Sequence, residues 1–188
     1  MPVISEDKPA GADKIQTSQT ASFFDEITKK KLDGKLGEGF TAALEKTAQN
    51  INCKPDDLLA ILCVESMLET NAENKGHYGI LQISWKRLKS YGTSGAALKW
   101  MTGTEQLKYV EKYFKDKDIN PEGRKLSLGD LYTKVFLPGR SGKDILCSKG
   151  EKYYKQNKGL DVNKDGKITK TDLEKAARIR MRNILNSL

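Results

Sequence analysis

Seven consecutive apolar residues, LLAILCV at positions 58–64, are followed directly by a carboxylate, Glu65. Pro55 fits the first position of a helix, and the two acidic residues after it favour a first turn. A helix that is apolar on every side is stable only when other elements cover it. The sequence therefore predicts a buried helix from Pro55 to Ser66, with a charged group at its end.

Helical patterns dominate the rest of the chain, and strand patterns are scarce. Four further segments are predicted to be helices, namely 40–51, 101–117, 127–138 and 171–188. Thr102 has Glu105 three residues later, which is the spacing of a capping box at a helix start. Thr171 and Glu174 have the same spacing. These patterns predict a mostly α fold, in which the short stretch 79–84, GILQIS, is either a strand or the opening of a helix.

Three regions are predicted along the chain. Residues 1–21 are polar and indicate a flexible tail, residues 22–148 one mostly α domain, and residues 149–188 a basic appendage. The first residues lack the basic and apolar regions of a secretory signal, so we expect synthesis in the cytoplasm, after which the protein either stays there or is exported by a route that ignores such signals. No apolar stretch approaches the ~20 residues that span a bilayer, so we expect no membrane span.

The chain has a net charge of +8. Such an excess of positive charge favours polyanionic partners, such as nucleic acid, acidic lipid or the bacterial cell wall. The other interpretation is that the charge only keeps the protein soluble. The basic residues are spread along the chain without a nucleic-acid-binding motif, so we expect no nucleic-acid partner.

Three cysteines and a single histidine, His77, lack the spacing of a zinc site. Cys63 stands inside the apolar run and is predicted to be a small core residue. The sequence does not decide whether Cys53 and Cys147 form a disulfide.

Glu65 is the first candidate catalytic residue. A carboxyl group in an apolar cleft has its charged form disfavoured, so its pKa rises. A raised pKa keeps the group protonated near neutral pH, as a general acid requires. A glutamate at a helix end is more often a solvated surface group, so the pattern alone does not assign a function.

The segment 53–84 resembles the core of the lysozyme-like lytic transglycosylases, a family related to goose-type lysozyme. Their pattern is an apolar helix that ends in Glu-Ser, a loop of roughly a dozen residues, and Gly-Leu-Met-Gln. Here the parts are Glu65-Ser66 and residues 79–82, with Leu81 in place of methionine. The resemblance covers roughly residues 40 to 140 and implies a lysozyme-like fold with a small lobe of loops and strands.

The third motif of that family is Ala-Tyr-Asn on a later helix. The nearest match is DLYTKVF, where Tyr132 fits the tyrosine, Leu131 replaces the alanine and Thr133 replaces the asparagine. The extended match LYTKVFLPG resembles the phage-tail and secreted-effector branch of these enzymes.

The resemblance implies a role for each matched residue. Glu65 would be the catalytic acid and then the base, and Tyr132 would hold its carboxyl group through the phenol hydroxyl. Ser66 would orient the substrate or the glutamate, Gln82 would bind sugar through its amide, and Gly79 belongs with the substrate-binding residues. His77 and the aromatic residues Trp85 and Tyr91 stand near these motifs, where contact with sugar and simple packing both stay open.

Glycosidases usually need two carboxylates, and Glu69 and Glu73 are the candidates for a second one. The resemblance favours a lytic transglycosylase, which uses a hydroxyl of the substrate as nucleophile, cuts between N-acetylmuramic acid and N-acetylglucosamine and forms a 1,6-anhydro product. The alternatives are a hydrolytic lysozyme that uses Glu69 or Glu73, a non-catalytic wall-binding module, and a calcium-dependent interaction module. We expect peptidoglycan strands as the substrate, type VI or phage delivery of an antibacterial effector, and an immunity protein or secretion machinery as partners.

A second motif, DVNKDGKITKTD, resembles the calcium loop of an EF-hand. Gly166 stands where the loop must turn sharply, Ile168 is the apolar anchor and Thr169 is at position nine. The predicted Ca²⁺ ligands are Asp161, Asn163, Asp165, the carbonyl of Lys167 and Asp172. Position twelve is usually glutamate, so the shorter Asp172 puts bidentate ligation in doubt, and a polar turn before a helix is the other interpretation.

Overall fold

The computed structural model describes residues 24–116, 119–120 and 123–188, so the predicted tail at 1–21 lies outside the described residues. Helices make up 60% of the described part of the chain, which confirms the mostly α prediction. The helices are α1 (Glu26–Leu36), α2 (Phe40–Asn50), α3 (Pro55–Ser66), α4 (Trp85–Ser90), α5 (Gly95–Leu98), α6 (Gly103–Lys115), α7 (Leu128–Phe136), α8 (Lys152–Asn157) and α9 (Lys170–Ser187), with short 3-10 helices η1 (Pro138–Arg140) and η2 (Lys158–Leu160). The strands are β1 (Glu73–Asn74), β2 (His77–Tyr78), β3 (Ile83–Ser84), β4 (Ile145–Ser148) and β5 (Lys167–Thr169).

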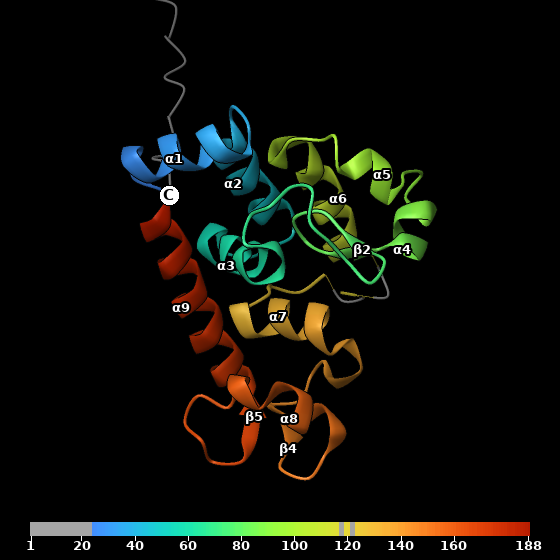
Figure 1. Cartoon of the computed structure of the whole chain (residues 1–188), viewed down its shortest axis with the longest axis vertical. Helices are drawn as coiled ribbons and strands as arrows, with labels where there is room; N and C mark the ends of the chain where they lie inside the picture. The colour runs from blue at the N-terminus through green and yellow to red at the C-terminus, as the bar shows by residue number, and fades with distance from the viewer. Residues whose placement is uncertain (1–23, 117–118, 121–122) are drawn as a thin grey trace, which may run out of the picture.

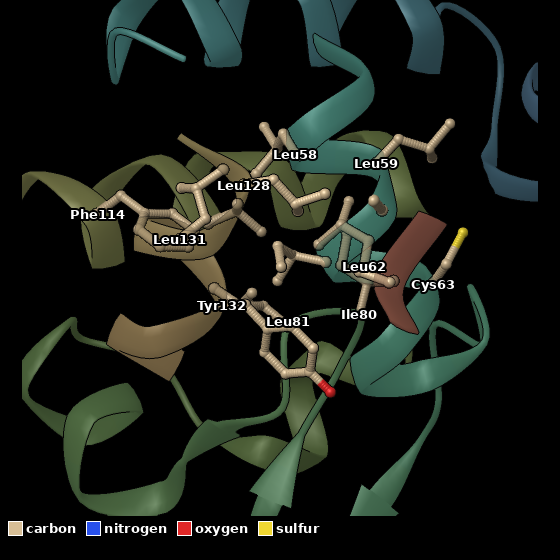
Figure 2. Packing of buried hydrophobic residues seen from close by; sticks show 14 of the residues in the cluster. Leu58, Leu59, Leu62, Cys63, Ile80, Leu81, Phe114, Leu128, Leu131 and Tyr132 are labelled. Atoms are coloured by element: carbon tan, nitrogen blue, oxygen red, sulfur yellow. The ribbon is translucent and has the colours of Figure 1, made fainter. Parts of the chain in front are cut away.

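Helix α3 lies at the centre of the fold, as the apolar run predicts. Every residue from Leu58 to Cys63 is fully buried, because α2, α7 and α9 all pack against the helix. Figure 2 shows the leucines of α3 meeting Leu128 and Leu131 of α7 and Ile80 and Leu81 of the small lobe. Fully burying each of these side chains stabilises the fold by about 1.5–3 kcal/mol.

Of the two capping boxes predicted from the sequence, one is confirmed and one is wrong. Thr102 and Glu105 form the predicted capping box of α6. The prediction for the last helix is wrong, because α9 begins at Lys170 with a capping box between Thr169 and Asp172. Thr169 ends β5 in an extended conformation, which is the conformation of an N-cap, so the helix begins earlier than Thr171.

The small lobe is an antiparallel three-stranded meander in the order β1-β2-β3. Of the two structures considered for the stretch 79–84, the strand is present at its end, and a helix begins directly after it. Residues 79–82 form a turn, Ile83 and Ser84 form β3, and α4 begins at Trp85. This meander lies in front of α6 and beside the end of α3 (Figure 1).

The C-terminal region packs into the same core. Strands β4 and β5 pair antiparallel, and from there α9 runs back along α3 toward α1 (Figure 1). Leu173 and Ala177 of α9 are fully buried. Arg178 forms ion pairs with Asp57 and, at 2.6 Å, with Asp56 at the start of α3. The segment predicted as an appendage therefore covers one side of the central helix.

Cys53, Cys63 and Cys147 are free thiols, so the disulfide that the sequence left open is not formed. Cys63 is a fully buried core residue, as predicted, and burial raises its pKa to about 12. Among the described residues, no helix combines the length and the apolar character needed to cross a membrane.

Candidate active site

A cleft of about 610 Å³ opens at the C-terminal end of α3. Its walls come from the three-stranded lobe, from α4 and α6, from the end of α7 and from α9. The polar side chains that line it are Glu65, Ser66, Glu73, Asn74, His77, Gln82, Ser84, Arg87, Tyr113 and Arg180. Five residues singled out from the sequence, Glu65, Ser66, Gln82, Glu73 and His77, are therefore brought to one cavity.

Glu65 stands in the last turn of α3 and lines this cleft. Helix α3 ends directly after it, because Met67 and Leu68 both adopt left-handed conformations, with φ of 55° and 63°. Such conformations cost non-glycine residues of order 1 kcal/mol each, and the burial of Leu68 compensates here. The two turns therefore stop the helix with Glu65 at the edge of the core.

Burial raises the pKa of Glu65 from its ordinary value of 4.5 to about 7. The negative end of the helix dipole acts in the same direction, because it disfavours a carboxylate in the last turn. No side chain of the described residues donates a hydrogen bond to the carboxyl group. Glu65 is thus close to half protonated at neutral pH, which is the property that the sequence predicted for a general acid.

Two tyrosines lie near the Glu65 carboxyl group. Burial and the charge of Glu65 raise the pKa of Tyr132 to about 12. Burial is also the main cause of a pKa of about 12 for Tyr113, with Glu65 again contributing. The Tyr113 hydroxyl donates a hydrogen bond of 3.2 Å to the carbonyl oxygen of Lys134. Glu65 therefore faces two neutral phenols that stay protonated throughout the physiological range.

The predicted hydrogen bond between Tyr132 and Glu65 is not formed within the described residues. Tyr132 is buried, with its ring edge-on to Phe136 at 5.9 Å, and its hydroxyl points away from the leucine cluster (Figure 2). Thr133 also differs from the asparagine that it replaces, because it is buried and its hydroxyl donates to the carbonyl oxygen of Gly129 at 2.7 Å. Of this motif, Tyr132 is the residue whose pKa is affected by the charge of Glu65.

Gln82 lines the cleft in a left-handed conformation, with φ of 53°. Its amide nitrogen donates hydrogen bonds to the carbonyl oxygens of Gly79, at 2.9 Å, and Ala72, at 3.2 Å. The side-chain carbonyl oxygen is consequently the part of Gln82 that is available to a ligand. Ser66 is similar, since its hydroxyl donates to the carbonyl oxygen of Leu62 at 3.2 Å and keeps its acceptor lone pairs.

Gly79 shapes the site without lining it. Its φ of 75° favours glycine, and a β-carbon there would overlap Oε1 of Gln106 and come within 2.9 Å of Leu98. Gln106 is almost fully buried and accepts a hydrogen bond of 2.9 Å from the backbone N–H of Ile80. Its amide nitrogen donates to the carbonyl oxygens of Thr70, Leu98 and Met101. These hydrogen bonds of Gln106 hold the backbone of the GILQ motif in place. In the sequence, Gln106 could have been noticed as a polar residue on the apolar face of segment 101–117.

The two candidates for a second carboxylate lie in different places. Glu69 is exposed, pairs with Lys35 at 2.7 Å and does not line the cleft. Glu73 lines the cleft from β1 and pairs with Lys99, and the hydrogen bond from that ammonium holds the pKa of Glu73 below its usual range. The cleft therefore contains one carboxyl group with a raised pKa and one with a lowered pKa.

The aromatic residues near the motifs have separate positions. Trp85 is 53% exposed and lies against Gly76, outside the residues that line the cleft. Tyr91 is partly buried and donates a hydrogen bond of 3.1 Å to Asp116, so it packs the small lobe. His77, on β2, is exposed at the cleft wall.

The loop 161–172 turns sharply at Gly166, where the sequence predicted a sharp turn. Gly166 has a φ of 84°, and the Asp161 carboxylate accepts hydrogen bonds from the backbone N–H groups of Asp165, at 3.1 Å, and Gly166, at 2.9 Å. Tyr154 also donates to Asp161, at 2.6 Å. Asp172 caps α9 and is buried. The oxygen-rich donor set fits Ca²⁺ in type.

The same loop does not gather its acids around one point. Among the described residues, no group of three or more His, Cys, Asp or Glu side chains is arranged to hold a metal ion. Asn163 and Asp165 instead hydrogen-bond to each other, at 3.1 Å, and Asp165 accepts from the backbone of Lys167 at 2.8 Å. Calcium binding by this loop is therefore a proposal that rests on its residue types and its turn.

A comparison of the chain with protein-family models finds no match. Comparisons with curated proteins and with solved structures find no match either. The likeness to lysozyme-like enzymes therefore rests on the Glu-Ser, GILQ and Tyr132 motifs, and the activity that it implies is a proposal.

Proposed function

We propose that the protein cleaves the β-1,4 bond between N-acetylmuramic acid and N-acetylglucosamine in peptidoglycan, with Glu65 as general acid and then base. The observation that carries the proposal is the pKa of about 7 for Glu65 in an open cleft. A carboxyl group with that pKa can give a proton to a glycosidic oxygen and take one back at the same pH. The net charge of +8 supports a polyanionic substrate such as the cell wall.

A lytic transglycosylase reaction needs no carboxyl group besides Glu65. Glu65 gives its proton to the glycosidic oxygen as the bond from that oxygen to C1 of the muramyl ring breaks. The Glu65 carboxylate then takes the proton from the C6 hydroxyl of the same ring, whose oxygen bonds to C1. The products are a 1,6-anhydro-muramyl end and a free 4-hydroxyl, and no water is consumed. Because the nucleophile belongs to the substrate, it is already positioned.

Hydrolysis is the second candidate, and the position of Glu73 favours it. Glu73 lines the cleft with a lowered pKa, while Glu65 has a raised one. A pair of carboxyl groups whose pKa values diverge is the arrangement of a glycosidase acid and its ionised partner. Digestion in heavy-oxygen water separates the two reactions. Hydrolysis puts the heavy isotope into new reducing ends, and transglycosylation puts none into the product.

The activity itself is tested by the clearing of purified cell-wall suspensions. Glu65→Gln keeps the size of the side chain and removes the proton that can be transferred, so we expect clearing to fall at least a hundred-fold. Glu69→Gln is the matched control, since Glu69 is exposed and pairs with Lys35 outside the cleft. Clearing by Glu65→Gln at the rate of the control would refute the proposal and favour a non-catalytic wall-binding module.

Delivery and calcium complete the proposal. A substrate outside the inner membrane fits an antibacterial effector carried by a secretion machine or a phage particle, with an immunity protein that fills the cleft. Ca²⁺ on the loop 161–172 would have a structural role, because that loop leads directly into α9, which covers α3. A calcium-dependent interaction module is favoured instead if Ca²⁺ exposes apolar surface in the protein.

A further inference from the structure

Arg180 interrupts the apolar side of α9. Leu173 and Ala177 are fully buried against the core, and Ile184 is partly buried against it. Arg180 stands between them at helical spacing, three residues after Ala177 and four before Ile184. A charged residue on the packed side of a helix breaks the local pattern, and such breaks are expected where a residue serves function.

Arg180 is tolerated at this position because its side chain faces the cleft instead of the core. It lines the cavity that contains Glu65, and its side chain is exposed rather than packed. Its charge lowers the pKa of Cys63 and of Tyr132, opposing burial at both, so the guanidinium lies beside α3 and α7. Figure 2 shows a segment of α9 beside Cys63. The end of α9 thus brings a positive charge to the cleft from the far end of the sequence.

Arg180 has no structural partner in the described part of the chain. It makes no ion pair or hydrogen bond there, whereas Arg178 on the same helix pairs with Asp57. Arg87, which lines the cleft from α4, pairs with Asp116 and packs 5.5 Å from the ring of Tyr113. Arg180 is therefore a cleft cation whose five N–H donors are available to a ligand.

Arg180 and Glu65 line the same cleft, and in the described part of the chain they form no ion pair. Burial is the cause of the raised pKa of Glu65, whereas the charge of Arg180 acts on the pKa of Tyr132. A cation placed in this way can bind an anion next to the reacting bond while the Glu65 carboxyl group keeps its raised pKa.

We propose that Arg180 binds a carboxylate of the substrate beside the bond that is cut, which rests on the proposed function. Muramyl residues supply two such carboxylates. One is the lactyl carboxylate of a strand without peptide, and the other is a carboxylate of an attached stem peptide. Arginine pairs with either through two parallel hydrogen bonds, and lysine cannot reproduce that geometry.

The experiment compares Arg180→Gln with Arg182→Gln on three substrates. Arg182 is exposed on the same helix and does not line the cleft, so it controls for lost charge. The substrates are peptide-bearing strands, peptide-free strands, and peptide-bearing strands whose carboxylates have been converted to amides. We expect Arg180→Gln to raise KM about three- to ten-fold on a carboxylate-bearing substrate, with kcat little changed, and to have no such effect on the amidated strands.

Each outcome decides a point. A rise in KM on peptide-bearing strands alone identifies a carboxylate of the stem peptide as the ligand of Arg180. A rise in KM on peptide-free strands identifies the lactyl carboxylate. The inference is overturned if the Arg180→Gln and Arg182→Gln variants have equal KM values, or if Arg180→Gln raises KM as much on amidated strands as on strands that keep their carboxylates. If the wild type cleaves none of the strands, the proposed function fails. Sedimentation with cell walls of the Glu65→Gln protein, with and without Arg180→Gln, then tests the binding of the carboxylate without cleavage.

Discussion

The raised pKa of Glu65 has a cost in stability that a single substitution measures. The pKa is 4.5 in an ordinary environment and about 7 in the folded protein. Each whole pKa difference between the folded and unfolded states is worth about 1.4 kcal/mol, so the ionised carboxylate destabilises the fold by about 3 kcal/mol. Glu65→Gln removes this cost and keeps the shape of the side chain.

The sign of the effect depends on pH. Well below pH 4.5 Glu65 is protonated in both states, so its ionisation costs no stability. As the pH rises toward 7, the unfolded state ionises first, so the wild type loses stability relative to Glu65→Gln. We expect the difference in unfolding free energy between Glu65→Gln and the wild type to change little near pH 4. Between pH 4 and pH 8.5 we expect this difference to grow by about 3 kcal/mol in favour of Glu65→Gln.

Urea unfolding followed by tryptophan fluorescence at a series of pH values measures this difference. Glu69→Gln is the control, because the exposed pair that it breaks with Lys35 is worth less than about 1 kcal/mol. A difference between wild type and Glu65→Gln that stays constant from pH 4 to 8.5 would show that Glu65 is not buried enough to serve as a neutral-pH acid.

Three further predictions concern the frame of the site. Gly79→Ala is expected to lose about 1–3 kcal/mol more than Gly92→Ala in urea unfolding, since both have left-handed φ but a β-carbon overlaps a neighbour only at Gly79. Ca²⁺ at a hundred times its Kd is expected to stabilise the wild type by about 2.7 kcal/mol and Asp161→Ala by far less, in thermal unfolding titrations; equal stabilisation would reject the loop as the site. Arg178→Gln is expected to cost about 1–3 kcal/mol at pH 7, because it leaves the buried Asp57 without its cation; a loss below 0.5 kcal/mol would contradict that role.

The local part of the site could be predicted from the sequence. The apolar run identified α3, and the Glu-Ser and GILQ spacing brought Glu65, Ser66 and Gln82 to one cleft. These residues are near in sequence, and helix and turn rules govern their relative positions. The predicted end of α3 at Ser66 is confirmed, and it places Glu69 outside the cleft, away from the helix face of Glu65.

The rest of the site depends on packing between distant segments. Tyr113, Gln106 and Arg180 come from α6 and α9, and each looked like part of an ordinary amphipathic helix. The sequence did not show which side of α9 meets α3, because that contact joins segments far apart in the chain, such as Arg178 and residues 56–57. Periodicity gives the faces of a helix, but not the neighbour that each face meets.

Mass spectrometry of digested peptidoglycan tests the central claim most directly. We expect the wild type to generate fragments with new 1,6-anhydro-muramyl ends, and Glu65→Gln at equal concentration to generate none above the undigested control. Equal amounts of cleaved fragments from both proteins, or no new muramyl ends from the wild type, would contradict the assignment of Glu65 as the acid of a peptidoglycan-cleaving site.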